Sequence, residues 1–172
     1  FFPVRNWDVK IENVDAASTL VLEPVTQKAL QHKNIFDSRP IASLTKLMTA
    51  LVVIDEMNLN NGVVVSKNAV ASYGDQGDLA AGEALTVEGL LHILLIESSN
   101  DAAIALEEYY NAYRLEVDKT FVAAMNAKAQ ELGLSDTFFV EPSGLNVNNR
   151  STAYDLARLA DYVFQRPILR QI

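Results

Sequence analysis

The chain has 172 residues, 49% of them hydrophobic, which is enough apolar content to bury one core, so a single domain is expected. The formal net charge of −8 argues against a nucleic acid or an anionic membrane surface as the partner. No cysteine is present, which excludes disulfides, and no apolar run reaches the roughly 18 residues that a membrane span needs.

A hairpin and then a long helix are predicted in the first third of the chain. Residues 19–22 and 28–31 flank a short turn, which is typical of a β-hairpin. The segment at about 43–57 is apolar on nearly every face, so we expect a helix buried in the centre of the domain. Pro40 stands just before this segment and fits a chain that enters a helix shortly afterwards.

Ser43 and Lys46 stand at the start of that helix, three residues apart. Residues at this spacing share a helix face, so the lysine amine can reach the serine hydroxyl. Burial lowers the pKa of an amine towards the range in which it accepts a proton, and a serine nucleophile needs such a base. Free N–H groups at the helix start can stabilise an oxyanion. The alternative is that Ser43 caps the helix and Lys46 is a surface lysine.

A second polar motif lies between two predicted helices, at about 86–97 and 101–113, after a predicted loop at 72–78. Ser98-Ser99-Asn100 forms the corner between these helices, where polar side chains can be held against a site. The similar triplet at residues 66–68 follows a short valine run and is typical of a surface turn. We therefore predict that Ser98 and Asn100 belong to the site.

Two more helices are predicted at about 119–132 and 152–165. The predicted helix signals are N-caps at Thr86, Asp118 and Ser151, a C-terminal glycine at Gly133 and a stop at Pro167.

The histidines and acidic residues suggest no other chemistry. We expect His32 to be solvated and His92 to lie in the core, which argues against a serine–histidine–aspartate triad. The neighbouring Glu107 and Glu108 are expected on a solvated face. No spacing is typical of zinc or calcium ligands, so no metal or cofactor is expected.

Three segments in chain order, at residues 40–50, 97–103 and 139–145, resemble the low-molecular-mass penicillin-binding proteins, which are serine D-alanyl-D-alanine carboxypeptidases and endopeptidases. The likeness runs from about residue 17 to 167. It implies the β-lactamase/DD-peptidase-like transpeptidase fold, of the α/β (α+β) class. Here the chain would supply the helical portion and an N-terminal hairpin.

The resemblance also implies a role for each site residue. Ser43 would be the acylated nucleophile and Lys46 its proton acceptor. Ser98 would relay a proton to the leaving group, and Asn100 would hydrogen-bond the acyl-side amide of the substrate. The family's third motif, a Lys-Thr-Gly strand that binds the substrate carboxylate and lends an oxyanion N–H, does not occur in this sequence. We therefore expect residues 1–172 to form one C-terminally incomplete catalytic domain, which associates with those strands or with a second chain.

The implied activity is a serine DD-peptidase that acts on peptidoglycan stem peptides and is inhibited by β-lactams, with carboxypeptidase and endopeptidase both open. An exported bacterial protein is implied, in the periplasm or at the outer face of the cytoplasmic membrane, with a role in the cell wall and cell shape. A β-lactamase of the same fold and a non-catalytic module that binds peptidoglycan or a partner protein are the alternatives. Class A β-lactamases carry Glu-x-x-Leu-Asn, and the segment from Glu141 to Asn146 is one residue too long for it.

Overall fold

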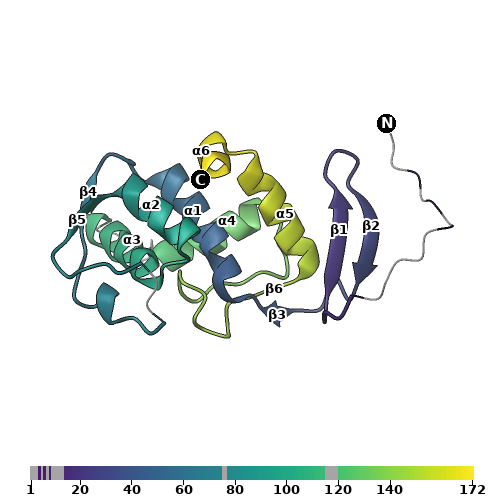
Figure 1. The fold of residues 1–172 in the computed structure, drawn as a ribbon, viewed down its shortest axis with the longest axis horizontal. Helices are drawn as coiled ribbons and strands as arrows, with labels where there is room; N and C mark the ends of the chain where they lie inside the picture. Colours follow the sequence, from purple (N-terminus) through teal and green to yellow (C-terminus); the bar gives the residue numbers. More distant parts are fainter. Residues whose placement is uncertain (1–3, 5, 7, 9–13, 75–76, 115–119) are drawn as a thin grey trace.

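The structure is a computed structural model that describes residues 4, 6, 8, 14–74, 77–114 and 120–172. Its helices and strands are drawn in Figure 1. The helices are α1 (Thr45–Glu56), α2 (Val87–Ile96), α3 (Asn100–Tyr113), α4 (Phe121–Glu131), α5 (Ala153–Phe164) and α6 (Pro167–Gln171), with 3₁₀ turns η1 (Ala42–Leu44) and η2 (Ala69–Ala71). The strands are β1 (Thr19–Glu23), β2 (Lys28–Lys33), β3 (Arg39–Pro40), β4 (Gly62–Val64), β5 (Ala84–Thr86) and β6 (Arg150–Ser151).

Helix α1 lies in the middle of the helical body, with α2 and α3 on one side and α4 and α5 on the other (Figure 1). Its side chains at Met48, Leu51 and Val52 are fully buried. Burying an aliphatic side chain of this size contributes about 1.5–3 kcal/mol. The all-round apolar pattern of the segment therefore has its expected result, a helix enclosed by other helices.

The strands form three separate antiparallel pairs, β1 with β2, β3 with β6, and β4 with β5. The predicted hairpin is confirmed, and its turn includes Gln27 in the left-handed region, with φ 57°. A register shift between Val21 and Leu22 bends β1. The hairpin lies at one end of the molecule, beside α5 (Figure 1). The short β3–β6 pair ties the chain before α1 to the segment before α5.

All five predicted helices are confirmed, with ends shifted by a residue or two. Thr86 caps α2 by accepting from the Gly89 N–H at 3.0 Å, as predicted. Gly133 follows α4 with φ 66°, also as predicted. The predicted cap at Ser151 is wrong: this residue pairs in β6, and Thr152 caps α5.

Two other boundary predictions differ from the structure. Asp118 lies outside the described residues, and the side chain that caps α4 is Thr120. Pro167 does follow the end of α5, but it also begins the short helix α6, which the sequence did not predict. Proline suits a first helical position because its missing N–H has no intrahelical partner there. Among the described residues, no helix is both long enough and apolar enough to cross a membrane.

Candidate active site

The chain enters α1 through the turn η1, which exposes Ser43. Ile41 donates its N–H to the Asn149 carbonyl at 3.2 Å, and the turn follows directly. Because Ser43 is exposed, its hydroxyl can be reached from solvent. The Lys46 amine lies 3.2 Å from the Ser43 Oγ. The structure thus brings together the two residues that their spacing put on one helix face.

The amine of Lys46 is enclosed by the protein, with only 3% of the residue exposed. Its Nζ lies 2.8 Å from Asn100 Oδ1 and 2.7 Å from the Ser143 carbonyl oxygen, and both oxygens accept an N–H. A neutral amine that uses two N–H groups in this way keeps its lone pair for the Ser43 hydroxyl. Burial lowers the pKa of Lys46 to about 8, although the negative charge of Glu141 opposes the shift.

Asn100 is the first residue of α3, and its amide is fully engaged within the protein. The Oδ1 accepts from Lys46, while the Nδ2 donates to the carbonyls of Tyr73, at 3.1 Å, and Gly74, at 2.9 Å. These contacts orient the lysine and hold the loop after η2. A hydrogen bond donated by Asn100 Nδ2 to a substrate amide requires one of the two loop carbonyls to be released, whereas Oδ1 has a second lone pair that can accept a substrate N–H.

Ser98 lies in the same corner, between α2 and α3, but differs from Asn100 in its contacts. It is half-buried and has a left-handed backbone, with φ 57°. The next residue, Ser99, caps α3 by accepting from the Ala102 N–H at 3.0 Å. The three hydrogen bonds of Lys46 go to Ser43, Asn100 and Ser143, and Ser98 is two residues before Asn100 in the chain.

The similar triplet at residues 66–68 lies in a turn away from these contacts. Ser66 accepts from the Ala69 N–H at 2.9 Å and so organises the entry into η2. Asn68 donates to Glu108 at 2.7 Å. The prediction that this triplet forms a turn is confirmed.

The loop at residues 141–149 also contacts Lys46, and the sequence analysis assigned none of its residues to the site. Besides the Ser143 carbonyl on Lys46, the Pro142 carbonyl accepts from the Thr49 hydroxyl at 2.7 Å. Asn149, fully buried, donates to the Thr45 hydroxyl at 3.1 Å. A signal was available: Thr45 and Thr49 put two hydroxyls on one face of an otherwise apolar helix, and buried hydroxyls need partners.

Gly144 brings this loop into contact with the backbone of the serine turn. A Cβ at this position would lie 2.0 Å from the Ala42 carbonyl oxygen and 2.9 Å from the Ser43 nitrogen. Its φ of +95° also favours glycine. A glycine is therefore required here for the loop to approach the serine so closely.

The comparisons with known proteins identify the family of the chain. The model of peptidase family S11, described as D-alanyl-D-alanine carboxypeptidase, matches residues 6–172. The chain belongs to the S11 family. The resemblance inferred from the three sequence segments is thereby confirmed.

Curated relatives of this S11 chain carry both activities in their names. A D-alanyl-D-alanine carboxypeptidase of Bacillus subtilis is 36% identical over 152 residues, which are 85% of this chain and 38% of that protein. A D-alanyl-D-alanine endopeptidase of Pseudomonas aeruginosa is 36% identical over 162 residues, 93% of this chain and 51% of that protein. The chain thus spans about half, or less, of the length of these relatives, and the equal identities do not separate the two activities.

Solved structures show the same fold. The crystal structure of a D-alanyl-D-alanine carboxypeptidase from Mycobacterium tuberculosis matches with a TM-score of 0.85 at 30% identity, covering 96% of this chain and 62% of that one. A carboxypeptidase from Francisella tularensis matches with a TM-score of 0.80 at 29% identity, covering 93% and 40%. The predicted DD-peptidase fold class is confirmed.

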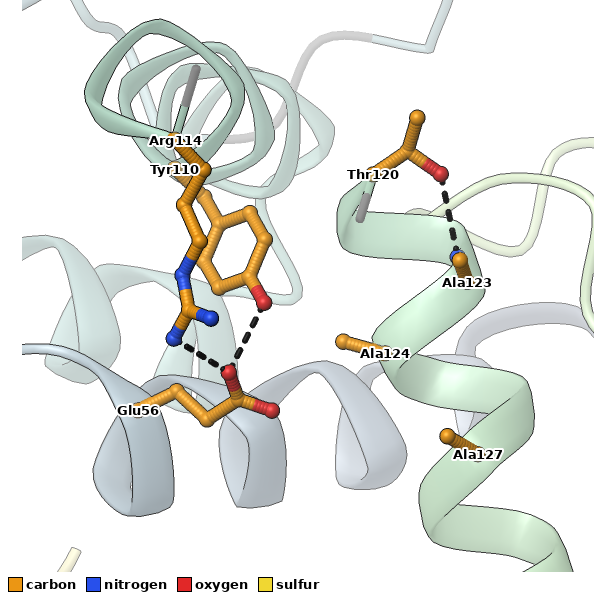
Figure 2. Close-up of a pocket in the computed structure, with 7 residues that line it drawn as sticks. All are labelled: Glu56, Tyr110, Arg114, Thr120, Ala123, Ala124 and Ala127. Atoms are coloured by element: carbon orange, nitrogen blue, oxygen red, sulfur yellow. Dashed lines mark hydrogen bonds and ion pairs between the residues drawn. The ribbon is translucent and has the colours of Figure 1, made fainter. Parts of the chain in front are cut away.

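A pocket of about 300 Å³ lies at the opposite end of α1 from Ser43 in the S11 chain (Figure 2). Glu56 accepts there from Arg114 at 2.6 Å and from the Tyr110 hydroxyl at 2.8 Å. Burial and this carboxylate raise the pKa of Tyr110 to about 12. The carboxylate is already paired, so we assign this cluster to holding α1 against α3 and not to the candidate site.

Two predictions about titratable residues are corrected by the structure. His92 is exposed on α2, so its predicted place in the core is wrong; His32 is exposed, as predicted. Glu107 is half-buried on α3, so the predicted solvated face is wrong for this residue. Burial, and then the charges of Glu141 and Glu108, raise the pKa of Glu107 to about 7. In the described part of the chain, no group of three or more acidic or histidine residues is arranged to hold a metal ion.

Proposed function

We propose that the protein that contains this chain is a serine DD-peptidase, which cleaves D-Ala-containing bonds of peptidoglycan stem peptides through an acyl-enzyme on Ser43. One observation carries the proposal. An exposed serine hydroxyl lies 3.2 Å from a buried lysine amine whose pKa is lowered to about 8. A serine needs such a base, because its hydroxyl is a weak nucleophile at neutral pH. The names of the S11 relatives support the choice of substrate.

The reaction would begin with neutral Lys46. As the Ser43 Oγ attacks the substrate carbonyl carbon, its proton passes to the lysine amine. The peptide C–N bond then breaks, the leaving amine takes a proton, and water later hydrolyses the ester. The Leu44 and Thr45 N–H groups already donate within the turn, to Ile41 and Ala42. We assign the N–H of Ser43, which belongs to the nucleophile's own residue, to the oxyanion.

The two corner residues receive different roles in this proposal. Ser98 would relay the proton from Lys46 to the leaving amine. Asn100 would orient the lysine throughout, and would hydrogen-bond the acyl-side amide of the substrate. Both roles follow the family resemblance.

Further features of the proposal concern the whole protein. A substrate in peptidoglycan requires an exported protein, in the periplasm or at the outer face of the cytoplasmic membrane of a bacterium, with an effect on cell shape. β-Lactams would act as inhibitors, because they acylate the same serine. We also propose that residues 1–172 form one domain whose full activity needs a Lys-Thr-Gly strand, since this sequence contains no such motif.

The proposal is tested by covalent labelling of Ser43. A protein that carries residues 1–172 and a Lys-Thr-Gly segment should gain the mass of one penicillin, because opening of the β-lactam ring releases no leaving group. Ser43→Ala should abolish the adduct and keep the fold, since the residue is exposed. Peptide mass spectrometry locates the label. An adduct that persists in Ser43→Ala would remove this residue from the role.

A further inference from the structure

The carboxylate of Glu141 organises the loop at residues 141–149. It accepts from the backbone N–H groups of Ser143 at 2.7 Å, Gly144 at 2.6 Å and Asn146 at 3.3 Å. It also accepts from the Ser143 hydroxyl and from the Asn149 amide, the latter at 2.6 Å. Donors surround both oxygens, and an ionised carboxylate is a group that only accepts.

Single residues of the loop connect Glu141 to Ser43 and to Lys46. The Ser143 residue that donates to Glu141 also gives its carbonyl to the Lys46 amine, at 2.7 Å. Gly144, which donates to the other carboxylate oxygen, lies against the Ser43 backbone. Ser143 and Gly144 therefore each bind the Glu141 carboxylate through their N–H groups, and they also contact Lys46 and the Ser43 backbone, respectively.

We propose that Glu141 is a positioning residue for the Ser43–Lys46 pair, which holds the Ser143 carbonyl on the lysine amine and Gly144 against the serine turn. The proposal deepens the proposed function and rests on it. Glutamine cannot replace Glu141, because its NH₂ group would face N–H donors in place of an acceptor. At least one N–H donor of the loop would then lose its partner.

The charge of Glu141 acts on the lysine in addition to the hydrogen bonds. Two titratable groups on helices interact electrostatically with this carboxylate, Lys46 on α1 and the half-buried Glu107 on α3. The negative charge raises the pKa of Lys46 and so opposes the larger effect of burial. Without Glu141, both the charge and a well-placed Ser143 carbonyl, each of which favours the protonated amine, would be lost.

The first test measures the lysine directly by NMR in the 172-residue chain, labelled with ¹³C and ¹⁵N. We expect Lys46 to titrate at a lower pH in Glu141→Gln than in the wild type. The matched control is Glu23→Gln, because Glu23 also accepts N–H groups of its own turn, in the hairpin. It should leave the Lys46 titration unchanged. The proposal would be overturned if the Lys46 pKa in Glu141→Gln were unchanged, or if it rose towards the pKa of an ordinary lysine.

A second measurement needs no variant and covers the case in which Glu141→Gln does not fold. In the wild type, the Glu141 carboxyl ¹³C resonance should shift as Lys46 loses its proton around pH 8, because the Ser143 peptide connects the two groups. A resonance that does not change through that titration would overturn the proposal.

Acylation kinetics separate this proposal from the proposed function. In the protein that carries a Lys-Thr-Gly segment, Glu141→Gln should form the penicillin adduct about 10²-fold more slowly, as displaced reacting groups do. The acid limb of its pH–rate profile should also move to lower pH. A wild type without any adduct would contradict the proposed function and leave the NMR result to decide on Glu141. A variant acylated like the wild type, at every pH, would contradict the role of Glu141 alone.

Discussion

At the scale of single residues, the environment of one amine decides what the candidate site can do. An ordinary lysine, with a pKa near 10.4, is neutral in fewer than about one molecule in a thousand at pH 7. With a pKa of about 8, Lys46 is neutral in about a tenth of the molecules. This gain comes from burial, and Asn100 and Ser143 keep the buried amine supplied with acceptors.

The role of Ser98 can be tested with Ser66, in the similar triplet at residues 66–68, as the control. Ser98→Ala should reduce turnover of a D-Ala-D-Ala peptide by about 10²-fold or more, because a proton-transfer partner is lost. Ser66→Ala removes a hydroxyl that only organises a turn, so turnover should stay unchanged. Steady-state assays of both variants make the comparison. Equal losses, or a larger loss at Ser66, would mean that the second motif was assigned to the wrong helix corner.

At the scale of secondary-structure elements, α3 carries both a candidate site residue and a half-buried acid. Asn100 starts the helix, and Glu107 lies two turns further on. The folded state raises the pKa of Glu107 from 4.5 to about 7, so between these values the folded chain binds more protons than the unfolded one. The contribution of Glu107 to stability is therefore favourable at low pH and is lost as the pH rises from about 4.5 to 7.

Glu107→Gln should consequently stabilise the chain at pH 8, on the order of 2 kcal/mol, because no buried charge then forms. At pH 4.5 and below, the difference from the wild type should largely disappear. Urea unfolding at pH 4.5 and pH 8 measures both values. A difference that does not depend on pH would show that Glu107 titrates normally in the folded chain.

At the scale of the whole molecule, the candidate site depends on segments from across the chain. The turn before α1, the corner before α3 and the loop before α5 meet around one amine, although Lys46 and Ser143 are 97 positions apart in the chain. The β3–β6 pair and the Asn149 contacts join the first and last of these segments. The environment of the Ser43–Lys46 pair therefore depends on the folded domain.

We expect residues 1–172 alone to hydrolyse a D-Ala-D-Ala peptide at the background rate. By family resemblance, a Lys-Thr-Gly strand supplies an oxyanion donor and the carboxylate-binding groups. Loss of one oxyanion donor costs about 10²–10³ in rate, and a poorly anchored substrate reacts more slowly still. Addition of such a segment, in cis or in trans, should restore turnover. Robust turnover by the monomeric 172-residue chain would show that its own residues complete the oxyanion hole.

The sequence by itself determined the features that arise from local physics. The apolar pattern predicted each of the five long helices, and Thr86 and Gly133 marked two of their ends correctly. The three-residue spacing put Ser43 and Lys46 on one face. Periodicity, caps and spacing act between near neighbours in the chain, so they can be recognised without knowledge of the fold.

Only the tertiary structure decided how the site is built. His92 lies in an apolar helix yet faces solvent, because helix packing determines which face is covered. The loop that contains Glu141 has no periodic pattern of residues. Its Ser143 carbonyl reaches Lys46 only when the chain has folded around α1. The lowered pKa likewise depends on burial by distant segments. Such long-range contacts involve irregular segments, in which no local pattern of residues predicts which distant residue will be the contact partner.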